Sequence, residues 1–244
     1  MTLGRTANSA EQGIQALGLF LTVLAAIVFL SGACAGADAP ELVKNGMFTT
    51  GSAGEPLGWG HAAYFSTNDA VKFEWIPSAS GAGVLKISNL TANDSRWVQT
   101  LSVLPSHWYH VSGWIRTEKA GTQVPGGYLV EMNSNAESAD LRGTHDWQPV
   151  EFWFRTEKDQ KVADLACRIG GYSALNTGTA YFAAISMTPA GGFPEGADHV
   201  YGASVFDYFS QRVIIFVSAM ILLASAILLW RFVMGDLSGG AGAE

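Results

Sequence analysis

Charged residues are scarce in this sequence. Only 14% of the 244 residues are Asp, Glu, Lys or Arg, whereas soluble domains average about 25%. The 21 acidic residues outnumber the 14 basic ones, and no cluster of Lys or Arg occurs along the chain. A net charge of −7 repels phosphate backbones and anionic membrane surfaces. The composition therefore argues against nucleic acid as a partner.

Cysteines and catalytic motifs are equally few. Cys34 and Cys167 lie in segments of different character, so no disulfide between them is expected. The chain has no Gly-x-Ser-x-Gly elbow, phosphate-binding loop or Cys–His arrangement. His107 and His110 are three residues apart, a spacing that points side chains to opposite faces of a strand and predicts no metal site. We expect a non-catalytic protein without a cofactor, although paired carboxylates of the glycosidase kind remain an open alternative.

The uncharged residues concentrate in two apolar runs, 13–30 and 213–230. A helix of about 17–20 apolar residues is long enough to cross a bilayer. Arg5 precedes the first run and Arg231 follows the second, so the positive-inside bias places residues 38–211 outside the cytoplasm. The sequence thus predicts a transmembrane helix over 212–234, a cytoplasmic tail over 235–244, and a periplasmic main domain held at the cell (inner) membrane.

Residues 1–37 allow two interpretations. The sequences ACA at 33–35 and AGA at 35–37 match the A-x-A pattern that signal peptidase cleaves. The segment is therefore either a cleaved signal peptide or a retained N-terminal anchor. Acylation of Cys34 is a weaker alternative, because Ser31 stands where lipoprotein signals normally carry an aliphatic residue. For the second run, a buried core helix is disfavoured because such helices rarely lack a polar face over that length.

Between residues 42 and 187 the apolar residues alternate with a period of two, which is the period of a β-strand. Turn residues such as Pro105 and Pro125 separate the alternating segments. Many short strands with regular turns are typical of an all-β sandwich or barrel. We predict a β-sandwich over 38–188, with strands over 97–103, 109–116, 127–132, 150–156, 163–170 and 181–187. Residues 189–211 are expected to form a linker and a juxtamembrane segment rich in aromatic residues.

Four motifs occur in a recognisable order: LVKNGMF with PLGW (42–48 and 56–59), WVQTLSVLPSHWYHVSGWIRTE (97–118), HDWQPVEFWFRT (145–156) and GTAYFAAISM (178–187). In this order they resemble the galactose-binding-like jelly rolls, nearest to the carbohydrate-binding modules of families four, nine and twenty-two. The resemblance covers about 41–188 and implies an antiparallel β-sandwich with a glycan-binding surface. Many such modules bind a structural calcium through an Asp in the final strand. Here Ala183 and Ala184 stand in those places, so an oxygen-rich cation site loses a ligand and the resemblance does not extend to a calcium prediction.

The first motif predicts how the domain begins. Asn45 and Gly46 both tolerate a positive φ, so they are expected to form a turn at the end of a first strand. Phe48 and Trp59 are then expected to fill the core on either side of a glycine-rich loop.

Alternation divides each predicted strand into two faces. The apolar sets, including Tyr128, Val130 and Met132, are assigned to the core. If the strands are neighbours, the other face carries two indoles, an amide, a carboxylate and three guanidinium groups: Trp114, Trp153, Asn133, Glu131, Arg116, Arg155 and Arg168.

Flat aromatic rings beside planar polar groups suit a sugar, whose CH face packs on the indole while its hydroxyls are hydrogen-bonded. These residues are therefore the carbohydrate-binding candidates. The alternative is a face whose Trp–Arg and Glu–Arg pairs only stabilise the sheet, or which packs against a partner protein. Tyr64, Trp75 and Tyr172 are weaker candidates in loops at the edge of the sandwich.

Three functions remain open: a glycan-binding module tethered to the membrane, an accessory or structural subunit of a larger membrane protein complex, and an enzyme. The sequence favours the second slightly, because a small module with a membrane span and no catalytic domain has little evident use alone. Its partners would be the lipid bilayer and a complex contacted through the transmembrane helix and the juxtamembrane aromatics. The glycan-binding module is the alternative.

Overall fold

The computed structural model describes residues 39–78, 81–204, 207, 216–217 and 219–230. The chain divides into two units, Met1–Ala39 and Pro40–Glu244. Apart from Ala39 the first unit lies outside the described residues, and the predicted signal peptide or anchor over 1–37 lies there with it.

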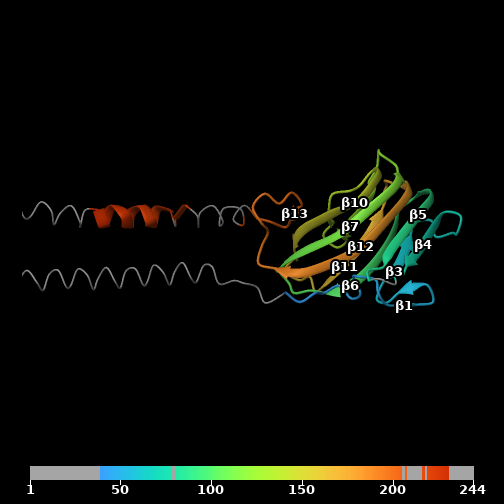
Figure 1. Cartoon of the computed structure of the whole chain (residues 1–244), viewed down its shortest axis with the longest axis horizontal. Coiled ribbons are helices and arrows are strands. Elements are labelled where there is room, and N and C mark those ends of the chain that lie inside the picture. Colours follow the sequence, from blue (N-terminus) through green and yellow to red (C-terminus); the bar gives the residue numbers. More distant parts are fainter. Residues whose placement is uncertain (1–38, 79–80, 205–206, 208–215, 218, 231–244) are drawn as a thin grey trace, which may run out of the picture. The chain divides into compact units, whose positions relative to one another are not determined.

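The second unit contains a sandwich of two β-sheets (Figure 1). The order in the six-stranded sheet is β13-β10-β7-β12-β5-β4, and in the five-stranded sheet β3-β6-β11-β8-β9. A short hairpin, β1-β2, precedes them. The strands are β1 (Gly51–Ser52), β2 (Glu55–Pro56), β3 (Gly60–Ala63), β4 (Val71–Ile76), β5 (Val84–Asn93), β6 (Ser95–Ser102), β7 (Trp108–Ala120), β8 (Gly127–Glu131), β9 (Ala136–Glu137), β10 (Gly143–Arg155), β11 (Val162–Ile169), β12 (Asn176–Ala190) and β13 (Val200–Tyr201).

The core forms between the inner faces of the two sheets. Alternation on β7 buries Val111 and Ile115 completely and leaves Trp114 on the outer face. Phe152 and Phe154 of β10 and Phe182 of β12 complete the inner surface of the six-stranded sheet. The five-stranded sheet contributes Trp97, Leu101, Leu129, Leu165, Cys167 and Ile169. The predicted all-β sandwich is therefore confirmed.

The predicted strands match β6, β7, β8, β10, β11 and β12, although β7, β10 and β12 extend further than their alternation indicated. Strands β3, β4 and β5 were not predicted. Strand β5 contains the polar run Ser-Asn-Leu-Thr-Ala-Asn, and its buried Asn89 and Asn93 bond to backbone carbonyls instead of facing solvent. Polar residues satisfied in this way conceal a buried strand from a hydrophobicity pattern.

The predicted faces of β8 were wrong. Leu129 and Glu131 point inward, because the register pairs them with the inward-facing Cys167 and Leu165 of β11. Tyr128 and Val130 instead form a separate small cluster with Ala166 on the outer face of the five-stranded sheet. Apolar residues on both faces of β8 made its inner face impossible to assign from alternation alone.

The N-terminal segment forms a turn, as predicted, but residues 39–44, the described part before it, contain no strand. Asn45 has a positive φ of 55°, and its side-chain Oδ1 accepts the amides of Thr49 and Thr50. Gly46 is required for a different reason: a Cβ there would lie 1.9 Å from the carbonyl oxygen of Ile185 in β12. Phe48 and Trp59 are buried in the core as predicted, with ring centroids 5.4 Å apart.

Residues 191–203, which we call the strap, follow β12 and pack on the outer face of the six-stranded sheet. The strap contains β13, which pairs in parallel with β10 and so adds a sixth strand. Phe193 in the strap is 6% exposed. The first part of the predicted linker over 189–211 is therefore folded onto the sandwich, whereas Phe206, Tyr208 and Phe209 lie outside the described residues.

Residues 216–217 and 219–230 are helical, and Trp230 is 64% exposed. Among the residues that the structure describes, no helix combines the length and the hydropathy needed to cross a membrane. Residues 212–215, 218 and 231–234 of the predicted span, and the predicted tail over 235–244, lie outside the described residues.

Candidate functional site

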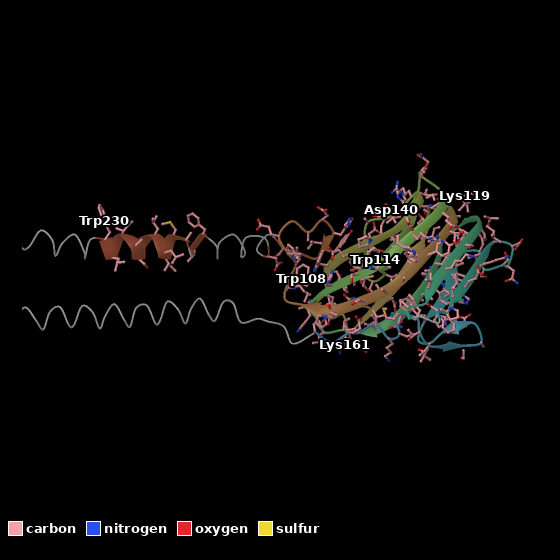
Figure 2. The ribbon with its side chains drawn as sticks, viewed as in Figure 1. Trp108, Trp114, Lys119, Asp140, Lys161 and Trp230 are labelled. Carbon is pink, nitrogen blue, oxygen red and sulfur yellow. The ribbon has the colours of Figure 1, made fainter. Side chains whose placement is uncertain are left out.

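The exposed centre of the six-stranded sheet carries the best candidate site. Trp114 lies midway along β7 (Figure 2), and 45% of its surface is exposed. On either side, the register sets it opposite Pro149 of β10 and Ala183 of β12. A shallow hollow of about 250 Å³ adjoins the indole, lined by Ser112, Gly113, Trp114, Pro149, Val150, Glu151 and Ala184. We call this surface the Trp114 face.

A β-bulge in β12 shapes the hollow. The register between β12 and β7 shifts between Ala183 and Ser186, and Ala184 adopts a positive φ of 51°. A bulge of this kind bends a strand and breaks the row of side chains across the sheet. Ile185 of the bulge donates its amide to the Gly46 carbonyl at 3.0 Å. The N-terminal turn therefore holds the bulge beside Trp114.

Glu151 lies on the polar side of the hollow, and His110 contacts it from the next row of the sheet. The Nε2 of His110 lies 2.9 Å from Oε2 of Glu151, and the imidazole stacks on the indole of Trp153 with centroids 4.5 Å apart. Glu151 is 56% exposed at its side chain. Its carboxylate is thus fixed in place by the histidine but still has free acceptor positions facing solvent.

A row of five polar and aromatic side chains runs across the sheet on the other side of Trp114: Glu74, Lys86, Tyr181, Arg116 and Glu118. The guanidinium of Arg116 lies 4.1 Å from the Tyr181 ring centroid, and the Tyr181 hydroxyl donates to Glu118 at 3.1 Å. Lys86 lies 2.6 Å from Glu74, and this hydrogen bond raises the pKa of Lys86. We call these residues the polar row.

Trp153 shares the outer face with Trp114 but is covered. It is 8% exposed and packs in a cluster with Trp108 and with Phe193 of the strap. Its amide donates to the His199 carbonyl of the strap at 2.8 Å. The prediction that Trp153 presents an open platform was wrong, because the strap occupies that platform.

Of the predicted arginines, two share this sheet. Arg116 belongs to the polar row. Arg155 lies beyond Trp153 on β10, where its Nε donates to the Ser106 carbonyl at 3.3 Å and its Nη1 lies 3.8 Å from Asp207. Arg155 is therefore separated from Trp114 by the strap-covered tryptophans.

Glu131 and Arg168 belong to the other sheet and Asn133 lies in the turn after β8, so the seven predicted residues do not form one surface. Strands β8 and β11 pair with each other in the five-stranded sheet, whereas β7 and β10 pair in the six-stranded sheet. The assumption that all four strands share a face was wrong.

These three residues have local structural contacts. Glu131 is fully buried, and its carboxylate accepts the Ser134 amide at 2.8 Å and the Asp164 amide at 3.3 Å. Asn133 accepts a second bond from the Asp164 amide. Arg168 forms two bonds of 2.7 Å to Asp94, with both side chains nearly buried. These contacts are of the kind that fix loops and strands; whether any of them meets a ligand stays a prediction.

The weaker loop candidates differ in exposure. Tyr64 is 70% exposed and Tyr172 is 92% exposed. Trp75, predicted in a loop, lies instead in strand β4, where it is half-buried and donates its indole N–H to the Phe48 carbonyl. A second hollow of about 690 Å³ lies where the edge strands β3 and β4 meet, beside the stacked rings of His61 and Phe73. The two stacked rings cover one face of each other, and the His61 side chain is 37% exposed against 45% for Trp114, so this hollow offers a poorer platform than the Trp114 face.

Sequence reasoning missed Ser112, Glu151 and Tyr181. Ser112 and Glu151 alternate in phase with Trp114 and Trp153, so the strand pattern already placed them on the outer face. Tyr181 has no comparable signal, because its contact with Arg116 depends on the pairing of β12 with β7.

Metal and thiol chemistry receive no support in the described part of the chain. No group of three or more His, Cys, Asp or Glu side chains is placed to hold a metal ion among these residues. His107 bonds to the Pro105 carbonyl and His110 to Glu151, so the two histidines do not converge. Cys167 is free and fully buried, and burial raises the pKa of its thiol well above the usual range.

No family model and no curated protein matches the sequence. Solved structures similar to the chain include a CBM4 carbohydrate-binding module, with 16% identity and a TM-score of 0.43 over 61% of this chain and 99% of that one. TmCBM61 in complex with β-1,4-galactotriose has 15% identity and a TM-score of 0.44, over 62% and 100%. A cyclase from Fischerella sp. TAU has 15% identity and a TM-score of 0.40, over 62% and 98%. Because every one of these TM-scores is below 0.5, the function of this chain must be inferred from its own side chains.

Proposed function

We propose that the chain is a glycan-binding module and that its ligand stacks on Trp114. The observation that carries the proposal is a large indole left 45% exposed at the centre of a sheet, next to a polar hollow. A solitary exposed tryptophan is costly to leave in water, since fully burying a large apolar side chain is worth about 1.5–3 kcal/mol. A ligand with one apolar face and polar edges recovers that energy, and a pyranose ring has this character.

The polar side chains around the Trp114 indole are suited to hydrogen-bonding the hydroxyls of a sugar. Glu151 and Ser112 lie on one side of Trp114, and Arg116 with Glu118 lies on the other. Carboxylates accept hydrogen bonds from sugar hydroxyls, and a guanidinium donates to them. Ion pairs and the His110 contact already hold these side chains, so little conformational entropy is lost when a ligand binds.

We propose a binding role without catalysis. Glycosidases need two carboxyl groups roughly 5–9.5 Å apart. Glu151 pairs with Ser112, and Glu118 lies six residues further along β7, a separation of about 20 Å along an extended strand. Among the described residues, no hydrogen bond joins Ser112 to His110, as an activated nucleophile requires. Glu41 is the other carboxylate of this row, two strands from Glu151, and it accepts hydrogen bonds from the Ser186 hydroxyl and from the Val43 and Met187 amides. These bonds tie it to the junction between β12 and the N-terminal segment, and we assign it a structural role.

We further propose that the sandwich is held outside the cytoplasm at the cell (inner) membrane. The support comes from the sequence: the apolar runs 13–30 and 213–230 are long enough to span a bilayer, and Arg5 and Arg231 stand at the ends that the positive-inside bias assigns to the cytoplasm. The finer assignment to the galactose-binding-like jelly rolls is likewise supported by the four motifs. Protease treatment of intact spheroplasts tests the topology, because the sandwich is expected to be digested from outside while a C-terminal tag survives.

Membership of a larger membrane complex remains a prediction, since no contact of the described residues bears on it. Purification of the full chain in mild detergent, followed by mass spectrometry, tests it. A stable set of partners that is lost when 212–231 is deleted would establish the subunit role beside glycan binding.

The glycan-binding proposal is tested by screening the full chain on a glycan array together with Trp114→Ala. We expect the wild type to bind one class of glycan and Trp114→Ala to lose at least about ten-fold in affinity, or about 1.4 kcal/mol. The matched control is Tyr172→Ala, which removes an aromatic ring that is 92% exposed but lies in a loop outside the site. Equal binding by wild type and Trp114→Ala contradicts the proposal.

A further inference from the structure

The Trp114 face is closed on one side. Ser112 and Glu151 form the row next to Trp114 on this side. The following row on the outer face, two residues further along each strand, consists of His110, Trp153 and Thr188. The strap covers Trp153 of this row, because Ala197 and Val200 lie against the cluster that contains it. Phe193 of the strap packs on the neighbouring Trp108, with ring centroids 5.1 Å apart. On this side the row next to the hollow contains His110 and Trp153, and the strap covers Trp153.

The strap, which forms a wall on this side of the Trp114 face, is firmly attached to the sheet. The strap adds a strand to the sheet through β13, and the Trp153 amide bonds to the His199 carbonyl. Trp108, Trp153 and Phe193 are each less than 10% exposed, at 9%, 8% and 6%. A ligand that continued across this row would have to displace an aromatic cluster, which is costly because buried aromatic side chains contribute several kcal/mol each.

On the opposite side of Trp114 the described residues form no such wall. The polar row begins with Arg116, and the side chains of Arg116 and Glu118 are 33% and 46% exposed. At the far edge, Glu74 is 47% exposed. A chain of sugars leaving Trp114 in this direction crosses exposed polar groups that hydrogen-bond hydroxyls.

The size of the hollow fits a single ring. Its volume of about 250 Å³ is below the roughly 300–1,000 Å³ that accommodates a drug-sized ligand. One sugar ring stacked on Trp114 and extending over Ser112 and Glu151 fills it. The next ring must then lie on the open side.

From this asymmetry we infer that the Trp114 face recognises the end of a glycan chain and not its internal residues. The inference depends on the proposed glycan binding and specifies its ligand class. The terminal ring sits in the hollow, where Glu151 and Ser112 bond the hydroxyl that an internal residue would use for its next linkage. The remaining rings run across the polar row, and the strap excludes a further ring.

The test is the binding stoichiometry of the full chain on soluble β-1,4-glucan and β-1,4-galactan chains of defined and increasing length, and on the array-selected glycan in the same format. End recognition predicts a single protein per glycan chain at every length, with the dissociation constant per mole of chain constant within about two-fold, or 0.4 kcal/mol. Internal recognition predicts that the number of bound proteins and the affinity per chain rise with length.

Two variants complete the test. Phe193→Ala weakens the strap, so more than one protein is expected to bind each long chain, whereas Tyr172→Ala should behave as the wild type. Binding through Trp114 with a stoichiometry that grows with length in the wild type overturns end recognition but leaves the proposed function intact. Absence of binding to every glycan tested overturns both.

Discussion

The two halves of the outer face of the six-stranded sheet carry the same kinds of side chain and differ in what covers them. In the open half, Trp114 is 45% exposed beside a hollow; in the covered half, Trp153 is 8% exposed beneath the strap. Both indoles stand on the outer side of neighbouring strands, four residues apart in register. Outward orientation on a strand therefore does not make a residue available to a ligand, because a distant segment decides which half of the face is free.

The largest expected difference between the halves is in stability. Trp153→Ala removes a buried ring from the strap cluster and should lower the free energy of unfolding by about 3–5 kcal/mol. Trp114→Ala removes an exposed ring and should change it by less than about 0.5 kcal/mol. Urea denaturation of both variants measures the two values. Equal losses would mean that Trp114 is packed and that the two halves do not differ.

The next largest effect concerns the strap itself. Phe193→Ala should destabilise the sandwich by about 2–3 kcal/mol, less than a deep core aromatic because the strap can partly collapse onto the gap. Hydrogen exchange should accelerate at the Trp153 amide, which donates to the strap carbonyl of His199. The amide of Phe182 in the centre of the sheet serves as the internal control. Unchanged exchange at Trp153 would show that Phe193 does not hold the strap.

A smaller loss of stability is expected from a change at Gly46, which supports the bulge next to the open half. Gly46→Ala places a Cβ against the Ile185 carbonyl, so the turn or the bulge must shift, at a cost of about 1–3 kcal/mol. Glycan affinity should fall with it, because the bulge shapes the hollow. Gly60→Ala is the matched control, since a Cβ there has no atom within 4 Å. If the two variants had equal stability and equal glycan affinity, the bulge would have no part in shaping the binding site.

The smallest effect is expected at the hollow's ion pair. Glu151→Gln weakens the contact with His110, and an exposed pair of this kind contributes about 0–1 kcal/mol to stability. Glycan affinity should fall by more than the free energy of unfolding, because replacing the carboxylate with an amide removes a charged hydrogen-bond acceptor from the hollow. Thermal unfolding measures the change in stability, and glycan titration of the same preparation measures the change in affinity. A stability loss larger than the affinity loss would mark Glu151 as structural.

The sequence predicted the class of fold and the orientation of several side chains, because both depend on local alternation. Trp114 and Arg116 were placed on an outer face, and Val111 and Phe152 in the core, from period alone. Phe48 and Trp59 were predicted to be buried from their place in the first motif. These results follow from the pleat of a strand, which fixes the face of each residue once one face is known.

The sheet to which each strand belongs could not be predicted in this way. Glu131 and Arg168 were grouped with Trp114, yet their strands pair in the other sheet. Pairing between strands far apart in sequence depends on the whole topology, which alternation does not encode. The burial of Trp153 depends on the same kind of information, because Phe193 and Val200 reach it from beyond β12.

The most direct test of the account follows the indole N–H signals of the eight tryptophans by NMR during a titration with the glycan that binds best on the array. The indole signal that disappears in Trp114→Ala belongs to Trp114, and the signal that disappears in Trp153→Phe belongs to Trp153. The account predicts that the Trp114 signal shifts in proportion to occupancy while the Trp153 signal stays in place beneath the strap. A shift of the Trp153 signal with Trp114 unmoved would contradict it.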